Sequence, residues 1–81
     1  METRTALIGI VIENPDSVDR LNSLLHDYKE YILGRMGLPH PSKSISIISI
    51  AIDAPADTIS ALSGKLGALP GVSTKTIYAK V

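Results

Sequence analysis

The chain has 81 residues, 44% of them hydrophobic, with eight basic and eight acidic side chains. This length and composition predict one globular domain over residues 1–81, and the balanced charge, without a basic block, argues against direct nucleic-acid binding. The absence of cysteine excludes disulfides, thiolate metal sites and cysteine nucleophiles.

The N-terminal part of the chain predicts a strand, a tight turn and a helix. Residues 5–12 are apolar on both alternating faces, which is typical of a central strand. Asn14 is a suitable helix cap, Pro15 suits the first helical position, and Asp16 is favourable near the positive end of a helix. Apolar residues then recur at helical spacing, in Val18, Leu21, Leu24, Leu25 and Tyr28.

The middle of the chain predicts a second strand and a breaker. Two glycines make residues 31–38 poor for a helix and typical of an edge strand that can hold a bulge. Two prolines in residues 39–43 indicate a hairpin or an extended loop. Residues 44–52 are apolar again and predict a third strand.

A second helix and a final strand complete the chain. Ile59, Leu62, Leu66 and Leu69 recur at helical spacing after Pro55. Gly67 or Gly71 is expected to supply the left-handed residue that ends this helix. Residues 72–81 alternate in character and predict an amphipathic strand.

The fold prediction depends on an internal repeat. The segment Ile12-Glu13-Asn14-Pro15 is echoed 40 positions later by Ile52-Asp53-Ala54-Pro55, each copy lying between a strand and a helix pattern. The first and third strands are the most apolar and belong inside the sheet, whereas the second and fourth have features of edge strands. We therefore expect an α+β, ferredoxin-like βαββαβ sandwich with antiparallel strand order 4-1-3-2 and two helices on one face.

This order leaves one face of the sheet without helices. The set expected to face the helices is Ile8, Ile10, Ile12, Ile48, Ile50 and Ile52, which leaves Leu7, Val11, Ile45, Ile47 and Ala51 on the other face. Leaving the larger of these in water forfeits roughly 1.5–3 kcal/mol each. We therefore predict a homo-oligomer, a homodimer or homotetramer, in which a second copy covers that face; an edge-paired dimer is the alternative.

No motif for catalysis or for a cofactor is present. His26 and His40 are interpreted as solvent-exposed rather than as metal ligands, and no nucleophile turn surrounds any serine. Glu13 and Asp53 are expected at the same end of the sheet, where they could form a carboxylate pair; the favoured interpretation is that each interacts with a helix dipole. Arg35, between two glycines, either holds a carboxylate or phosphate or faces solvent.

The segments 6–11, 31–39 and 45–50, together with 62–67 and 69–72, are similar to regulators of the iron-only hydrogenase system. This resemblance covers essentially the whole chain. It implies an ACT-like fold related to the ligand-binding domain of nickel-responsive repressors, and a regulatory part beside hydrogenase maturation functions. Residues 14–16 lack the glycine that ACT domains use to admit an amino acid, and the histidine and cysteine ligands of the nickel-responsive repressors have no counterpart.

From these observations we expect a non-enzymatic regulatory module that binds a small effector or a protein partner between subunits, without a metal or another cofactor. The residues expected to bind a ligand are Glu13, Asn14 and Asp16 of the first turn and Arg35, Met36 and Gly37 of the second strand. A small enzyme with its active site between subunits, and a structural assembly factor, remain the alternatives. No signal peptide or bilayer-spanning run is recognised, so the cytoplasm is the expected location.

Overall fold

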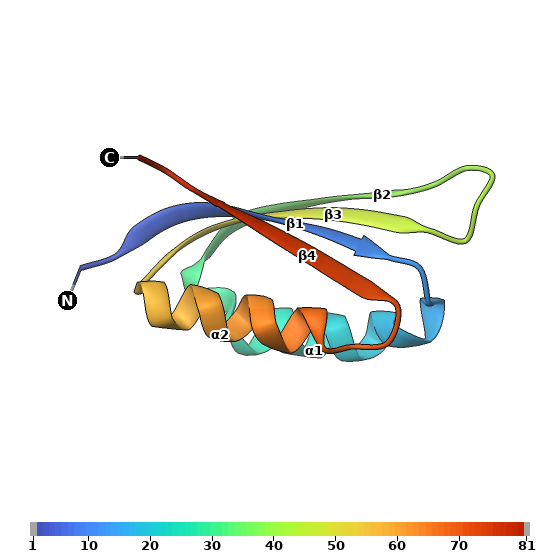
Figure 1. The fold of residues 1–81 in the computed structure, drawn as a ribbon, viewed down its shortest axis with the longest axis horizontal. Helices are drawn as coiled ribbons and strands as arrows, with labels where there is room; N and C mark the ends of the chain where they lie inside the picture. Colours follow the sequence, from blue (N-terminus) through green and yellow to red (C-terminus); the bar gives the residue numbers. More distant parts are fainter. Residues whose placement is uncertain (1, 81) are drawn as a thin grey trace.

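A four-stranded antiparallel sheet forms one layer of the molecule and two helices form the other, in a computed structural model that describes residues 2–80 (Figure 1). The elements in chain order are β1 (Arg4–Ile12), the 3₁₀ turn η1 (Pro15–Ser17), α1 (Val18–Asp27), the 3₁₀ turn η2 (Lys29–Tyr31), β2 (Ile32–Pro39), β3 (Ser46–Ala54), α2 (Ala56–Gly67) and β4 (Val72–Tyr78). No helix within residues 2–80 is long and apolar enough to cross a membrane.

The strand order is β2-β3-β1-β4, and each neighbouring pair is antiparallel. Read from the other edge this is the predicted order 4-1-3-2, so the ferredoxin-like α+β fold is confirmed. The two most apolar strands, β1 and β3, occupy the centre, because a central strand has neighbours on both sides and one face fully covered by helices.

The core lies between the sheet and the helices. All six isoleucines predicted to face the helices are buried there: Ile8, Ile10, Ile12, Ile48, Ile50 and Ile52. The helices bury Leu21 and Leu25 from α1, and Ile59, Leu62 and Leu66 from α2. Side chains alternate along a strand, so the residues between these isoleucines lie on the opposite face of the sheet.

The turn from α2 into β4 fastens the end of β1. Gly71 has a φ of 70°, so it, rather than Gly67, is the left-handed residue. A Cβ at Gly71 would lie 2.6 Å from the Cβ of Asn14. The backbone N–H of Glu13 donates to the Gly71 carbonyl at 2.7 Å. Only glycine therefore fits at this close approach of two backbones.

Several element boundaries differ from the predictions. The predicted cap at Asn14 is present, with its Oδ1 accepting from the Asp16 N–H at 3.0 Å, but a 3₁₀ turn precedes the α-helix, which begins at Val18. The third strand runs over Ser46–Ala54 instead of 44–52, because Asp53 and Ala54 continue the ladder with β1. Ile45 is half-buried and precedes the strand. The fourth strand is assigned to Val72–Tyr78, and Val81 lies outside the described residues.

The edge strand β2 contains the bulge that its glycines suggested. Ile32 pairs with Ile52 and Gly34 pairs with Ala51, so Leu33 is an extra residue on β2. Past the bulge, β2 and β3 form a long hairpin that extends beyond the helices (Figure 1). The extra residue determines which side chains of β2 face the helices and which face away.

Candidate functional site

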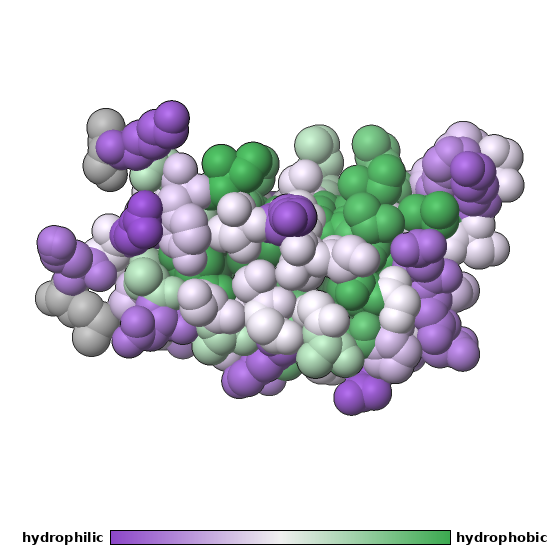
Figure 2. Space-filling model, in the orientation of Figure 1, coloured by the Kyte–Doolittle hydropathy of each residue, from purple (hydrophilic) through white to green (hydrophobic). Residues whose placement is uncertain are grey.

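The sheet face opposite the helices, here called the open face, carries most of the exposed large apolar side chains. Three rows of cross-strand neighbours place Leu38, Ile47 and Val11 in one row, Met36, Ser49, Gly9 and Lys75 in the next, and Gly34, Ala51, Leu7 and Ile77 in the third. The exposed fractions are Leu7 43%, Val11 37%, Met36 65%, Leu38 62%, Ile47 46% and Ile77 68%. Apolar groups gather along the upper side of the molecule in Figure 2, above the sheet.

Two shallow hollows lie on the open face, on either side of Ser49. One, of about 290 Å³, is lined by Gly9, Val11, Ile47 and Lys75 among others, and the second, of about 270 Å³, by Leu7, Gly34, Met36 and Ala51 among others. Small residues such as Gly9, Gly34 and Ala51 thus leave shallow depressions between the larger side chains. Among the residues of the three rows, only Lys75 carries a charge.

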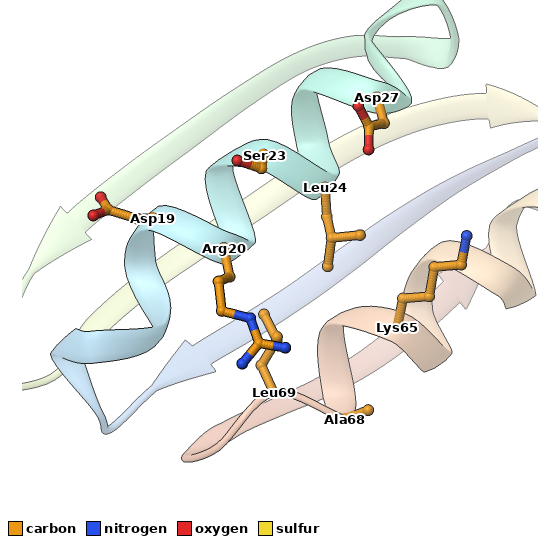
Figure 3. Close-up of a pocket in the computed structure, with 8 residues that line it drawn as sticks. All are labelled: Asp19, Arg20, Ser23, Leu24, Asp27, Lys65, Ala68 and Leu69. Atoms are coloured by element: carbon orange, nitrogen blue, oxygen red, sulfur yellow. The ribbon is translucent and has the colours of Figure 1, made fainter.

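A second candidate site is a groove between α1 and α2, on the helix side of the molecule (Figure 3). We call it the helix groove; its volume is about 550 Å³ and its lining residues are Asp19, Arg20, Ser23, Leu24, Asp27, Lys65, Ala68 and Leu69. This volume falls within the range typical of small-molecule sites, about 300–1,000 Å³.

The helix groove has two chemically different ends. The Arg20 side chain points toward Leu69 at one end, and Lys65 and Asp27 lie at the other (Figure 3). Lys65 Nζ donates to the Tyr28 hydroxyl at 3.0 Å. This hydrogen bond, with a smaller contribution from the charge of Asp27, raises the pKa of Lys65 above its ordinary value. Lys65 is therefore a cation that already has partners.

Three predicted ligand residues lie in the turn after β1. Glu13 and Asp16 are exposed and Asn14 is half-buried. The Asn14 side chain is engaged as the cap of η1, and the backbone of Glu13 is bonded to Gly71. These contacts of Asn14 and Glu13 therefore hold the turn together at one end of the sheet.

The other three predicted ligand residues lie along β2 and point in different directions. Arg35 pairs with the buried Ile50, and its guanidinium donates to Asn22 Oδ1 on α1 at 3.1 Å. Met36 pairs with Ser49 on the open face, and Gly37 pairs with Ile48. Pro39 on β2 and Ile12 on β1 both pair with Ser46, so these two residues lie level with each other beside the first turn. Arg35 precedes Pro39 by four residues, which places it about 13 Å along the strand from that turn. The structure thus brings Asn14 and Asp16 together, and does not bring the two groups into one pocket.

The expectation that Glu13 and Asp53 lie at the same end of the sheet is wrong. Strands β1 and β3 are antiparallel, so the end of one lies beside the start of the other. Asp53 pairs with Thr5, whose hydroxyl donates to Asp53 Oδ2 at 2.6 Å. Hydrogen bonds from the hydroxyls of Thr3 and Thr5 hold the pKa of Asp53 below its ordinary value. Glu13 and Asp53 therefore cannot act as a carboxylate pair within one copy.

The two histidines lie in separate places. His40, in the hairpin, accepts at Nδ1 from the Ser42 N–H at 3.1 Å. His26 is an exposed residue of α1, beside a hollow that Arg35 also lines. Within the described part of the chain, no three histidine, aspartate or glutamate side chains are grouped so that they could hold a metal ion.

Sequence reasoning missed the helix groove. Its residues come from two segments about 40 positions apart, and only packing of α1 beside α2 brings them together. One local signal was available: Arg20, Leu24 and Asp27 follow the spacing of a single helix face, which puts a charge at each end of an apolar contact.

The sequence matches the family described as "TM1266-like: Iron-only hydrogenase system regulator, putative" over residues 4–76. The structure is similar to that of an uncharacterized protein, TM1266, from Thermotoga maritima, at 39% identity and a TM-score of 0.93, covering 98% of this chain and 100% of the other. It also resembles a formyltetrahydrofolate deformylase from Pseudomonas putida KT2440, at 14% identity and a TM-score of 0.63, covering 90% of this chain and 28% of that protein, a likeness of fold alone. No curated protein matches the sequence.

Proposed function

Because the chain belongs to the TM1266-like family of iron-only hydrogenase system regulators, we propose that it is a non-enzymatic regulatory module that works as a homodimer, with the open faces of two copies packed together. The single observation that supports this proposal is the open face, where six large apolar side chains are exposed on a nearly uncharged surface. Contiguous apolar patches of this kind mark association surfaces.

A second copy is the occupant that fits this face best. The face is one side of a twisted β-sheet (Figure 1), and sheets pack face to face with interdigitating side chains at about 10 Å separation. The hollows beside Ser49 lie next to protruding residues such as Ile47 and Met36. Protruding side chains of one copy can therefore pack into the hollows of the other. Lys75 lies on the edge strand β4, where its ammonium can stay in water when the face is covered.

The size of the face indicates a moderate affinity. The projected area of the three rows across four strands is roughly 320 Å² per copy, and the side chains that protrude from the sheet add to this area. A standard stable interface buries about 800 Å² on each partner. Covering the exposed part of each of the six large side chains on each copy contributes about 1 kcal/mol, or about 12 kcal/mol for the dimer. Loss of translational and rotational freedom costs about 4 kcal/mol or more, which leaves about 8 kcal/mol. We therefore expect a dimer with a dissociation constant in the micromolar range or weaker, which suits a reversible regulator.

Sedimentation velocity over about 1–200 µM protein tests the assembly, since this range brackets a micromolar dissociation constant. We expect a shift from monomer to dimer in the unmodified protein. The variant I47E, with a carboxylate in the middle of the open face, should stay monomeric throughout. The control S60E carries the same new charge on the exposed side of α2 and should dimerise normally.

Two outcomes contradict the proposed assembly. If the unmodified protein stays monomeric across the whole concentration range, a second copy does not cover the open face. A dimer that I47E leaves intact would point to edge pairing through β2 or β4 instead. The regulatory part is tested in cells that contain the hydrogenase system: I47E should change hydrogenase activity to the same extent as deletion of the protein, and S60E should not.

A further inference from the structure

We propose that the helix groove binds a small aliphatic carboxylate, with the carboxylate on Arg20 and the apolar body on Leu24 and Leu69. This inference goes beyond the proposed function, because it concerns the opposite side of the molecule from the open face. The groove therefore stays accessible when two copies pack through their sheets.

The guanidinium of Arg20 is the charged group available to a ligand. It carries five N–H donors in a planar fork that matches a carboxylate. Within residues 2–80, it makes no hydrogen bond or ion pair with another side chain, whereas Arg35 is bonded to Asn22 and Lys65 to Tyr28. Figure 3 shows the Arg20 side chain reaching across the groove toward α2, and Asp19 pointing away from it.

The middle of the groove provides an apolar surface. Leu24 extends into it from α1, and Ala68 and Leu69 line it from the end of α2 (Figure 3). Leu24 is half-buried and packs against the core, which fixes its position. A ligand lying here would cover the exposed part of Leu24, with the largely buried Leu69 beneath it.

The far end of the groove requires no charge on the ligand. Lys65 donates a hydrogen bond to the Tyr28 hydroxyl there, and Asp27 lies at the same end of the groove (Figure 3). A neutral chain end can therefore rest beside them without breaking that hydrogen bond. Asp19, also in the lining, points away from the groove, so the anion-binding end presents the Arg20 guanidinium (Figure 3). A monocarboxylate with an aliphatic tail matches this arrangement.

The probe for the test is hexanoate, a six-carbon acid, titrated into ¹⁵N-labelled protein and followed by amide chemical shifts. We expect saturable shifts at Ser23, Leu24, Ala68 and Leu69, with little change at Leu7, Val11 and Ile47. Hexan-1-ol and hexylammonium test the carboxylate, and acetate tests the tail. Each should bind at least about tenfold more weakly than hexanoate, because a hydrogen-bonded charge or an apolar contact is lost.

The variant R20Q should weaken hexanoate binding by about tenfold or more, whereas K43Q, which removes one positive charge in the hairpin, should not. A68L fills the groove without removing a charge and should also weaken binding. The proposal is overturned by any of three results: no saturable shift, shifts centred on the open face, or equal binding of hexanoate by R20Q and the unmodified protein. Sedimentation of R20Q should still show the dimer, so failure here and failure of the proposed dimer are separate results.

Discussion

The central strands β1 and β3 contribute side chains to both faces of the sheet, and the two faces differ in how far those side chains are exposed. On β3, Ile48, Ile50 and Ile52 are buried under the helices, and Ile47 one step away is 46% exposed. The residue type is identical, so the difference comes from what covers each face. Isoleucine content shows how much apolar surface a strand has; the placement of helices determines how much of that surface remains for a partner.

The largest expected effect compares two isoleucines of β3. Ile50 is 0% exposed, so I50A should lower the free energy of unfolding by about 2–5 kcal/mol, because it leaves a cavity among packed side chains. I47A on the open face should lower it by less than about 1 kcal/mol in the monomer. Urea denaturation of dilute protein measures both. Equal losses would mean that the open face is already packed within one copy.

The next effect compares two glycines. Gly71→Ala should cost about 1–3 kcal/mol or more, because the residue has a positive φ and its new Cβ would meet Asn14. A Cβ added at Gly9, on the open face, would meet nothing closer than the Lys75 carbonyl oxygen at 3.8 Å. Gly9→Ala should therefore be neutral or stabilise the monomer by up to about 1 kcal/mol. Thermal melting of both variants is the measurement; a harmless G71A would contradict the tight turn.

A smaller effect separates two serines. Ser17 is buried, and its hydroxyl donates to the Pro70 carbonyl at 2.6 Å, so S17A should cost about 1–2 kcal/mol. Ser49 lies in the middle row of the open face, and S49A should change stability by no more than about 0.5 kcal/mol. If the two variants unfold at the same urea concentration, the Ser17 bond contributes little.

The smallest effect is a pH dependence at the polar end of the open face. The pKa of Asp53 is lowered in the folded state by the hydroxyls of Thr3 and Thr5, so its contribution to stability is present above the ordinary pKa of about 4 and is lost as the pH falls. The double variant T3V/T5V should therefore lose less stability than the unmodified protein between neutral and acid pH. S60A, which removes an exposed hydroxyl elsewhere, is the control. Parallel pH profiles for all three proteins would contradict this role.

The sequence was sufficient for the order of the strands and for the buried side of each central strand. The apolar character of β1 and β3, with isoleucines at every second position, and the glycines of β2 carried that information. It was not sufficient for the relation of Glu13 to Asp53, which depends on strand direction rather than on matching positions in the two halves. The helix groove is also a product of packing between distant segments.

The predicted ligand residues illustrate the same limit. Asn14 and Asp16 are adjacent because the cap of η1 joins them, as the sequence indicated. Arg35 was predicted as a further ligand residue, and its side chain is bonded to Asn22 on α1. Whether these residues bind a ligand stays a prediction. The direction of a side chain on an edge strand depends on the count of residues before it, and a bulge changes that count.

The bulge at Leu33 reverses which side chains face the helices in the remainder of β2. With this one extra residue, Met36 and Leu38 share a face with Ile47, and Arg35 reaches α1 on the other. If Leu33 were kept and the strand continued from Ile32 in regular register without the bulge, Arg35 would pair with Ser49 and Met36 with Ile48. That register would turn methionine and leucine toward the helices and place a guanidinium among the exposed apolar groups. The bulge therefore decides whether this edge of the open face is apolar or charged.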